Sequence, residues 1–289
     1  MLLIDSFTKS VLADPLDKSP LQFFDNHVKS SYGRAYKYKN NCIDFRFLPC
    51  ETTAEQNLWL HGQIDYEQWN REKWRFNSRD VLVAERNALN EIYESTEFGA
   101  SVLDVGGGCG LLKHFLPQTT KYLIVDPYAK ALTDIERASE LHAVYPFLKE
   151  PVNFVCGDAE FLPIAKNTFD TVHMRSCIDH FSNPELALCE AYRVLKDDGW
   201  LIVGTSIILE DGMIKTINLK SIASSIKNKL IGSIEDDHHT WHPSLDLIRS
   251  VLSNTGFQVI NEKRQSGFDG RVIYFFCKKI QTFSRERLA

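Results

Sequence analysis

The sequence lacks any C-x-x-C pair, and its cysteines do not cluster. This absence argues against a zinc ribbon or a thioredoxin-like redox motif, and an odd number of scattered cysteines is typical of reduced thiols. We therefore expect a cytoplasmic protein. The seven residues are Cys42, Cys50, Cys109, Cys156, Cys177, Cys189 and Cys277.

A basic excess and a long hydrophobic run are also missing. The formal net charge of −5 argues against a general nucleic-acid binder. The start MLLIDSFTKS has an early Asp5 and no basic region, so it does not resemble a secretory signal, and no segment approaches a membrane-spanning length. The 289 residues, 44% of them hydrophobic, suffice for one large α/β domain and an accessory region.

A glycine-rich segment, SVLDVGGGCG at residues 101–110, carries the strongest signal. Apolar residues at 102, 103 and 105 predict a buried strand, and residues 111–116 predict the opening of a helix. Gly106, Gly108 and Gly110 fall at the turn between them, where glycine allows a ligand to approach the main chain. Their G-x-G-x-G spacing differs from the dinucleotide fingerprint G-x-G-x-x-G, so it disfavours a nucleotide-dependent oxidoreductase.

Acidic residues mark the ends of further predicted strands. Asp126 follows an apolar run at 122–125, and Asp158 follows one at 152–156. A carboxylate such as that of Asp126, at the carboxyl end of a strand, can accept hydrogen bonds from both hydroxyls of a ribose. A fourth strand at 168–174 leads into the polar segment from Arg175 to Phe181.

With these motifs in order, the chain resembles the class I S-adenosylmethionine-dependent methyltransferases over roughly residues 80–280. NPELALCEAYRVLKDDGWLIVGT at 183–205 is similar to the family's next helix, turn and fifth strand, although Asp197 and Asp198 replace the commoner Pro-Gly. The resemblance implies an α/β fold, with a doubly wound, mostly parallel, seven-stranded Rossmann-like sheet and an antiparallel C-terminal hairpin. It also implies the cofactor S-adenosyl-L-methionine and the product S-adenosyl-L-homocysteine. The cofactor contacts expected from it are Asp104, Gly106, Gly108, Gly110, Asp126, Pro127, Asp158, Ala159 and Arg175.

The organisation divides at residue 78. Residues 1–78 are an N-terminal accessory or cap region, which either shapes the substrate site, forms a dimer surface or packs against the sheet. Residues 79–289 are the methyltransferase domain, beginning with a predicted helix at 79–93 and ending with a helix at 244–254 and strands at 257–261 and 272–278. An inserted segment at 210–234 predicts an amphipathic helix, either packed on the core or acting as a lid that touches an acidic lipid surface.

Histidines supply the candidate bases. Methyl transfer from a sulfonium is an in-line displacement that needs alignment and exclusion of water, and a hydroxyl acceptor also needs a base. His180 follows the fourth strand at the ligand-binding edge of the sheet, where it either acts as the base, caps a helix or lines the cofactor pocket. Asp179 either orients it or faces the acceptor. His238, His239 and His242, in EDDHHTWHPS, are competing bases.

The sequence disfavours a metal site and a covalent nucleophile, and it leaves two roles open for Arg175. His238 and His242 have helical metal-ligand spacing, but Pro243 biases His242 away from a helix, so we expect no metal. Arg175 either binds an acidic group or forms an ion pair within the fold. Cys177 lacks the partners of a covalent nucleophile.

We therefore expect an S-adenosylmethionine-dependent methyltransferase that acts on a hydroxyl of a small molecule, a sugar or glycosylated natural product. The alternative acceptors are a quinone, another lipid-linked phenol or an amine, and a further alternative is a non-catalytic cofactor-binding module. Expected partners are the small-molecule acceptor and a second copy in a homodimer. Peripheral membrane contact is open, whereas nucleic acid and a transmembrane segment are not expected.

Overall fold

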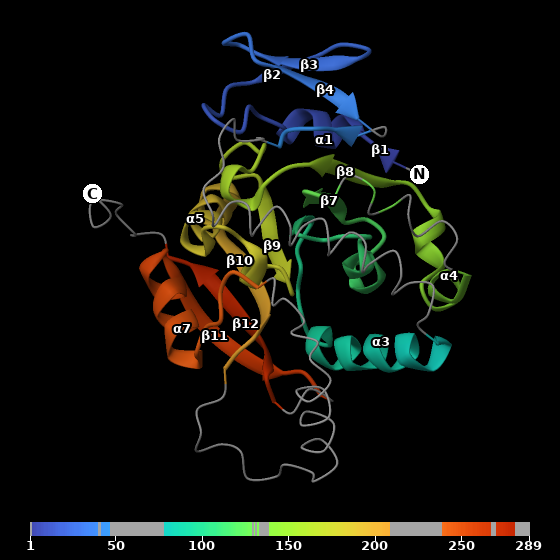
Figure 1. Cartoon of the computed structure of the whole chain (residues 1–289), viewed down its shortest axis with the longest axis vertical. Coiled ribbons are helices and arrows are strands. Elements are labelled where there is room, and N and C mark those ends of the chain that lie inside the picture. The colour runs from blue at the N-terminus through green and yellow to red at the C-terminus, as the bar shows by residue number, and fades with distance from the viewer. Residues whose placement is uncertain are drawn as a thin grey trace, which may run out of the picture.

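The computed structural model describes residues 2–39, 42–46, 78–128, 130, 132, 139–208, 239–266 and 270–280 (Figure 1). Its main element is an eight-stranded sheet in the order β1-β8-β7-β6-β9-β10-β12-β11. The inserted segment 210–234 and His238 lie outside the described residues.

The centre of the sheet is parallel, as the sequence predicts for alternating strands and helices. Each strand from β6 to β10 runs parallel to its neighbours in this group. β12 is antiparallel to both β10 and β11, which confirms the predicted C-terminal hairpin. A register shift between Val259 and Asn261 interrupts the outermost pairing. These strands are β6 (Ser101–Val105), β7 (Lys121–Asp126), β8 (Val152–Cys156), β9 (Phe169–Arg175), β10 (Leu195–Ser206), β11 (Phe257–Arg264) and β12 (Val272–Lys279).

Helices cover both faces of the sheet (Figure 1). α3 (Arg79–Tyr93) and α4 (Ser139–Val144) pack on one face, and α5 (Pro184–Val194) and α7 (Leu245–Asn254) on the other. Ser78 and Ser244 begin α3 and α7 by accepting hydrogen bonds from main-chain N–H groups three residues on.

The turn after β6 continues as a single 3₁₀ segment, η1 (Leu111–Phe115), rather than as a longer helix. Leu116 is already extended, because the residue before a proline, here Pro117, is disfavoured in helical geometry. Three further 3₁₀ segments connect the elements. They are η2 (Pro146–Lys149), η3 (Ala159–Phe161) and η4 (Ile178–His180).

The N-terminal region contributes to the main sheet. β1 (Leu2–Leu3) pairs in parallel with β8, which adds one strand to the seven expected. A hydrogen bond stabilises this edge, because the N–H of Asp5 donates to Asn153 Oδ1 at 3.0 Å. The sequence did not predict β1, because two residues are too few to show a strand pattern.

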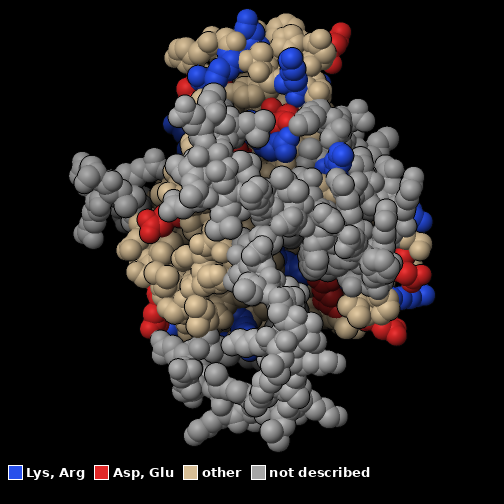
Figure 2. Space-filling view, viewed as in Figure 1, with Lys and Arg blue, Asp and Glu red and all other residues tan. Residues whose placement is uncertain are grey.

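The described N-terminal elements from α1 to β5 fold over one end of the sheet (Figure 1). α1 (Ser6–Val11) is followed by an antiparallel sheet of β2 (Leu21–Phe23), β3 (His27–Ser30), β4 (Ala35–Lys39) and β5 (Cys42–Ile43). Its inner residues, such as Val28 and Ile43, are fully buried in the core. Figure 2 shows basic side chains over this sheet, where Lys29 and Lys37 are exposed. The chain thus carries a local basic patch despite its negative net charge.

Candidate functional site

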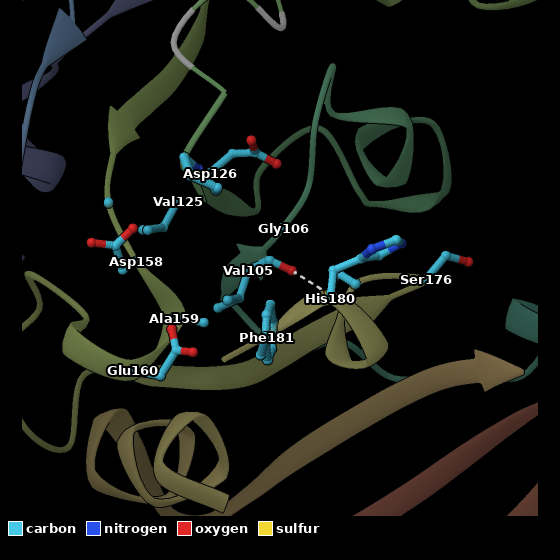
Figure 3. Close-up of a pocket in the computed structure, with 13 residues that line it drawn as sticks. Val105, Gly106, Val125, Asp126, Asp158, Ala159, Glu160, Ser176, His180 and Phe181 are labelled. Carbon is cyan, nitrogen blue, oxygen red and sulfur yellow. Dashed lines mark hydrogen bonds between the residues drawn. The ribbon is translucent and has the colours of Figure 1, made fainter. Parts of the chain in front are cut away.

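A cleft lies at the carboxyl ends of β6, β7, β8 and β9, the edge at which doubly wound sheets bind ligands. It encloses about 580 Å³, including space open to solvent. Figure 3 shows acidic side chains from the ends of β7 and β8 on one side and His180 on the other. Of the residues predicted from the sequence, the cleft is lined by Gly106, Asp126, Pro127, Asp158, Ala159 and His180.

Glycine is required by the backbone at three positions of the turn after β6. Gly106, Gly108 and Gly110 all have positive φ, at +67°, +52° and +81°. A Cβ on Gly106 would lie 2.5 Å from Cys177 Cβ, whereas a Cβ on Gly108 would meet no atom of the described residues within 4 Å. The main chain at Gly108 is therefore open to a ligand.

Asp126 is held at the rim of this turn by two main-chain donors. Its Oδ2 accepts from the N–H of Gly108 at 2.8 Å, and its Oδ1 accepts from the N–H of Tyr128 at 2.7 Å. Each carboxylate oxygen has a second lone pair, so the group can still accept from a ligand hydroxyl. The ribose contact of Asp126 stays a prediction.

Asp104 faces the side of the sheet that α3 covers. Its Oδ1 lies 2.7 Å from His173 Nδ1, and Tyr122 Oη donates to its Oδ2 at 2.5 Å. Tyr93 Oη lies 2.7 Å from His173 Nε2 and completes a buried chain of polar groups. Asp104 does not line the cleft. Its carboxylate instead packs against Gly107 of the glycine turn. A direct cofactor contact from Asp104 stays a prediction.

The sequence reading missed His173 and Glu160. The only signal for His173 was a polar residue between the apolar Val172 and Met174 of β9. Glu160 lines the cleft, and its Oε1 accepts from Ser182 Oγ at 2.9 Å and from the N–H of Asn183 at 3.0 Å. It thereby joins η3 to the start of α5.

The two predicted groups of histidines meet at one place. The rings of His180 and His239 lie 4.5 Å apart between centroids, and those of His239 and His242 lie 5.8 Å apart. Thr240 fixes the second segment by donating from its N–H to the carbonyl of Asp179 at 2.8 Å. Among the described candidate bases, His180, His239 and His242 are therefore parts of one cluster rather than separate sites.

Asp179 lies beneath this cluster. Its Oδ2 is 3.8 Å from His239 Nε2, and its buried Oδ1 has no hydrogen-bond partner among the described residues. A buried carboxylate oxygen without a donor is costly.

Arg175 takes part in an ion pair within the fold. Its Nη2 lies 2.7 Å from Glu85 Oε1 on α3, and its Nε donates to Tyr274 Oη at 3.0 Å. It does not line the cleft. Of the alternatives, the structural ion pair is the one observed, while a cofactor contact is still untested.

Other chemistries find little support in this cleft. Burial raises the pKa of the Cys177 thiol well above its ordinary value, which disfavours the thiolate needed of a nucleophile. Among the described residues, no three histidine, cysteine or acidic side chains converge as a metal site. No helix in the described part of the chain is long and apolar enough to cross a membrane.

Comparison with known proteins places this cleft in a family. A methyltransferase-domain model matches residues 103–203. A ubiquinone/menaquinone biosynthesis C-methyltransferase of Roseobacter denitrificans is 32% identical over 175 residues, which are 59% of this chain and 67% of that protein. A rice chloroplastic 2-methyl-6-phytyl-1,4-hydroquinone methyltransferase is 34% identical over 119 residues, 39% of this chain but only 33% of that protein.

A solved structure shares the fold. The Burkholderia thailandensis 1,6-didemethyltoxoflavin-N1-methyltransferase, determined with S-adenosylhomocysteine bound, superposes with a TM-score of 0.51 at 15% identity. The superposition covers 90% of this chain and 99% of that one. With its glycine turn, strand-end carboxylates and these relatives, the chain belongs to the class I S-adenosylmethionine-dependent methyltransferases.

Proposed function

We propose that the protein transfers a methyl group from S-adenosylmethionine to a small phenol of the quinol type. The observation that carries this proposal is the cleft itself, in which Asp126 and Asp158 share one cavity with His180. The names of the relatives, two of which act on quinones or hydroquinones, favour the quinol over the sugar hydroxyl that was our first expectation.

The residues of the cleft fit the cofactor. We assign Asp126 to the ribose hydroxyls and Asp158 with Ala159 to the adenine amino group. The open main chain at Gly108 leaves room that a Cβ would fill. When bound, the cofactor supplies an electrophilic methyl group on a positively charged sulfur.

The histidine cluster supplies the base. His180 accepts the proton of the phenolic hydroxyl, which makes the ortho ring carbon nucleophilic. That carbon forms the new bond to the methyl group, while the electron pair of the broken carbon–sulfur bond returns to sulfur. His239 takes the ring proton that leaves when the ring becomes aromatic again. The Asp179 carboxylate, whose Oδ2 lies 3.8 Å from His239 Nε2, stabilises the protonated His239.

Three further expectations belong to this proposal. They are the division at residue 78 into a cap region and a methyltransferase domain, the cytoplasmic location and the homodimer. The competing proposals are an amine as the acceptor and a non-catalytic cofactor-binding role.

The test begins with calorimetric titration of the whole chain with S-adenosylmethionine and S-adenosylhomocysteine. The protein is then incubated with S-adenosylmethionine and a reduced 1,4-naphthoquinone, a glycoside or an aromatic amine, and products are identified by mass spectrometry. Carbon methylation of the quinol supports the proposal. Methylation of the glycoside or amine alone overturns the acceptor class, binding without transfer to any acceptor supports the non-catalytic role, and no binding overturns the cofactor assignment.

A further inference from the structure

The chain after β5 runs along the end of β8, next to the cofactor cleft. Asp44 forms a parallel bridge with Cys156, and the N–H of Phe45 donates to the carbonyl of Cys156 at 2.9 Å. The residues that follow Cys156 are Gly157 and Asp158, which line the cleft. A segment of the N-terminal region therefore stands directly behind the cleft wall.

Arg46 connects this segment to the wall. Its Nε and Nη2 donate to the two carboxylate oxygens of Asp44, at 2.8 Å and 2.7 Å. Its Nη1 donates to the carbonyl oxygen of Pro127 at 2.9 Å. The hydrogen bond with Asp44 raises the pKa of Arg46, and the charge of nearby Asp158 adds to this effect. The side chain is only 19% exposed, so this contact is not a loose surface pair.

The Pro127 carbonyl belongs to the same planar peptide unit as the N–H of Tyr128. That N–H donates to Asp126 Oδ1 at 2.7 Å. Fixing the carbonyl therefore fixes the donor that orients the carboxylate. Proline adds to this rigidity, because its ring restricts φ.

We propose that Arg46 is a positioning residue of the cofactor site, which orients the Asp126 carboxylate through the Pro127–Tyr128 peptide. The inference rests on the proposed ribose contact of Asp126. It also gives the N-terminal region a specific task, because Arg46 lies before the expected methyltransferase domain in the sequence.

An arginine is needed for this geometry. The planar guanidinium occupies both oxygens of Asp44 and still presents Nη1 to Pro127. A lysine ammonium is a point charge on a flexible stem and does not reproduce this fixed fork. Arg46→Lys therefore keeps the charge and loses the alignment.

The test is titration with S-adenosylhomocysteine of the wild type, Arg46→Ala, Arg46→Lys and a matched control, Arg34→Ala. Arg34 is also paired with aspartates of the N-terminal region, including Asp14, and does not line the cleft. We expect Arg46→Ala to weaken binding about tenfold, the scale of one hydrogen bond to a charged group. Arg46→Lys should give a smaller loss, and Arg34→Ala should leave the affinity unchanged while lowering the melting temperature.

A double-mutant cycle with Asp126→Asn separates positioning from a general loss of structure. If Arg46 acts through the Asp126 carboxylate, Arg46→Ala costs little affinity once that carboxylate is gone. In the free protein, Arg46→Ala should also speed hydrogen exchange at the Tyr128 amide, which needs no cofactor for its measurement.

The outcomes distinguish the two proposals. Failure of the wild type to bind S-adenosylhomocysteine overturns the cofactor assignment and this inference together. Wild-type binding with unchanged affinity in a folded Arg46→Ala overturns the inference alone, as do additive losses in the cycle. If Arg46→Ala does not fold, unchanged affinity and unchanged Tyr128 exchange in Arg46→Lys overturn it.

Discussion

The imidazole rings of His180 and His239 lie against each other, with centroids 4.5 Å apart and planes at 30°. The sequence offered these histidines as competing bases, yet they share one place beside Asp179. We expect His180→Ala to lower kcat about a hundredfold, the usual contribution of a general base, without changing the affinity for S-adenosylhomocysteine. Steady-state rates and calorimetric titration check this.

His239→Ala separates the two roles. As the acceptor of the ring proton, His239 should also affect kcat, but less than His180 does. His27→Ala is the control, because His27 stacks on Phe24 in the N-terminal sheet, away from the cleft. Normal rates for both cluster variants would remove His180 and His239 from the mechanism.

Asp126→Ala should weaken binding of S-adenosylhomocysteine by about tenfold or more, since a hydrogen bond to a charged group contributes about 1.5–3 kcal/mol. The matched control is Asp170→Asn. Asp170 accepts from Ser101 and Lys196 at the opposite end of β9, so its loss should lower stability and spare binding. Equal affinities for the wild type and Asp126→Ala would rule out the ribose assignment.

Gly106→Ala and Gly108→Ala should differ in their effects. Both place alanine at positive φ, which costs about 1–2 kcal/mol. Only the Gly106 variant also drives a methyl group into Cys177, so it should have the lower melting temperature. Gly108→Ala should fold and lose cofactor affinity, because its methyl group enters the open space of the turn. Differential scanning calorimetry and titration measure these two effects, and similar melting temperatures would contradict the steric argument.

Alkylation with iodoacetamide should modify Cys189 well before Cys177. Cys177 is buried with a raised pKa, whereas Cys189 is partly exposed. Peptide mapping by mass spectrometry reads out both rates in the native protein. Faster labelling of Cys177 would revive it as a nucleophile candidate.

Stability should fall as the solution becomes acidic. Burial alone would raise the pKa of Asp170, but hydrogen bonds from Lys196 and Ser101 outweigh it and hold the pKa below 3.8. The pKa of Asp14 is lowered in the same way, with Arg34 as its main hydrogen-bond partner. A carboxyl group whose pKa is lower in the folded state than in the unfolded state stabilises the fold at pH values above its unfolded-state pKa. This stabilisation is lost as the pH falls through its folded-state pKa. Urea unfolding between about pH 5 and pH 2 should show the loss, and Asp170→Asn should reduce its slope.

Much of the fold followed from hydrophobic pattern. The buried strands show as apolar runs, and helices α3 and α7 show an apolar periodicity and begin at capping serines. The parallel topology then brings Asp126, Asp158 and His180 to one edge of the sheet. The same alternation shows why Asp104 lies elsewhere. Its neighbours Leu103 and Val105 face the α5 side of the sheet, so Asp104 must face α3.

The contacts that the sequence did not reveal depend on tertiary structure. Nothing local to Arg46 indicates Pro127, because the contact joins residues far apart in the chain. His173 reads only as a polar interruption of a strand until Tyr93 and Asp104 are placed beside it. The meeting of His180 with His239 likewise requires the packed fold.

The register shift in β11 affects how copies of this protein can meet. An unpaired strand edge can recruit a strand from another molecule, and a bulge with charged neighbours makes such pairing unfavourable. β11 has the shift after Val259, and Glu262 beside it is paired with Arg249. At the opposite edge of the sheet, β8 is already paired with β1. Growth of a continuous intermolecular sheet from β11 is thus disfavoured.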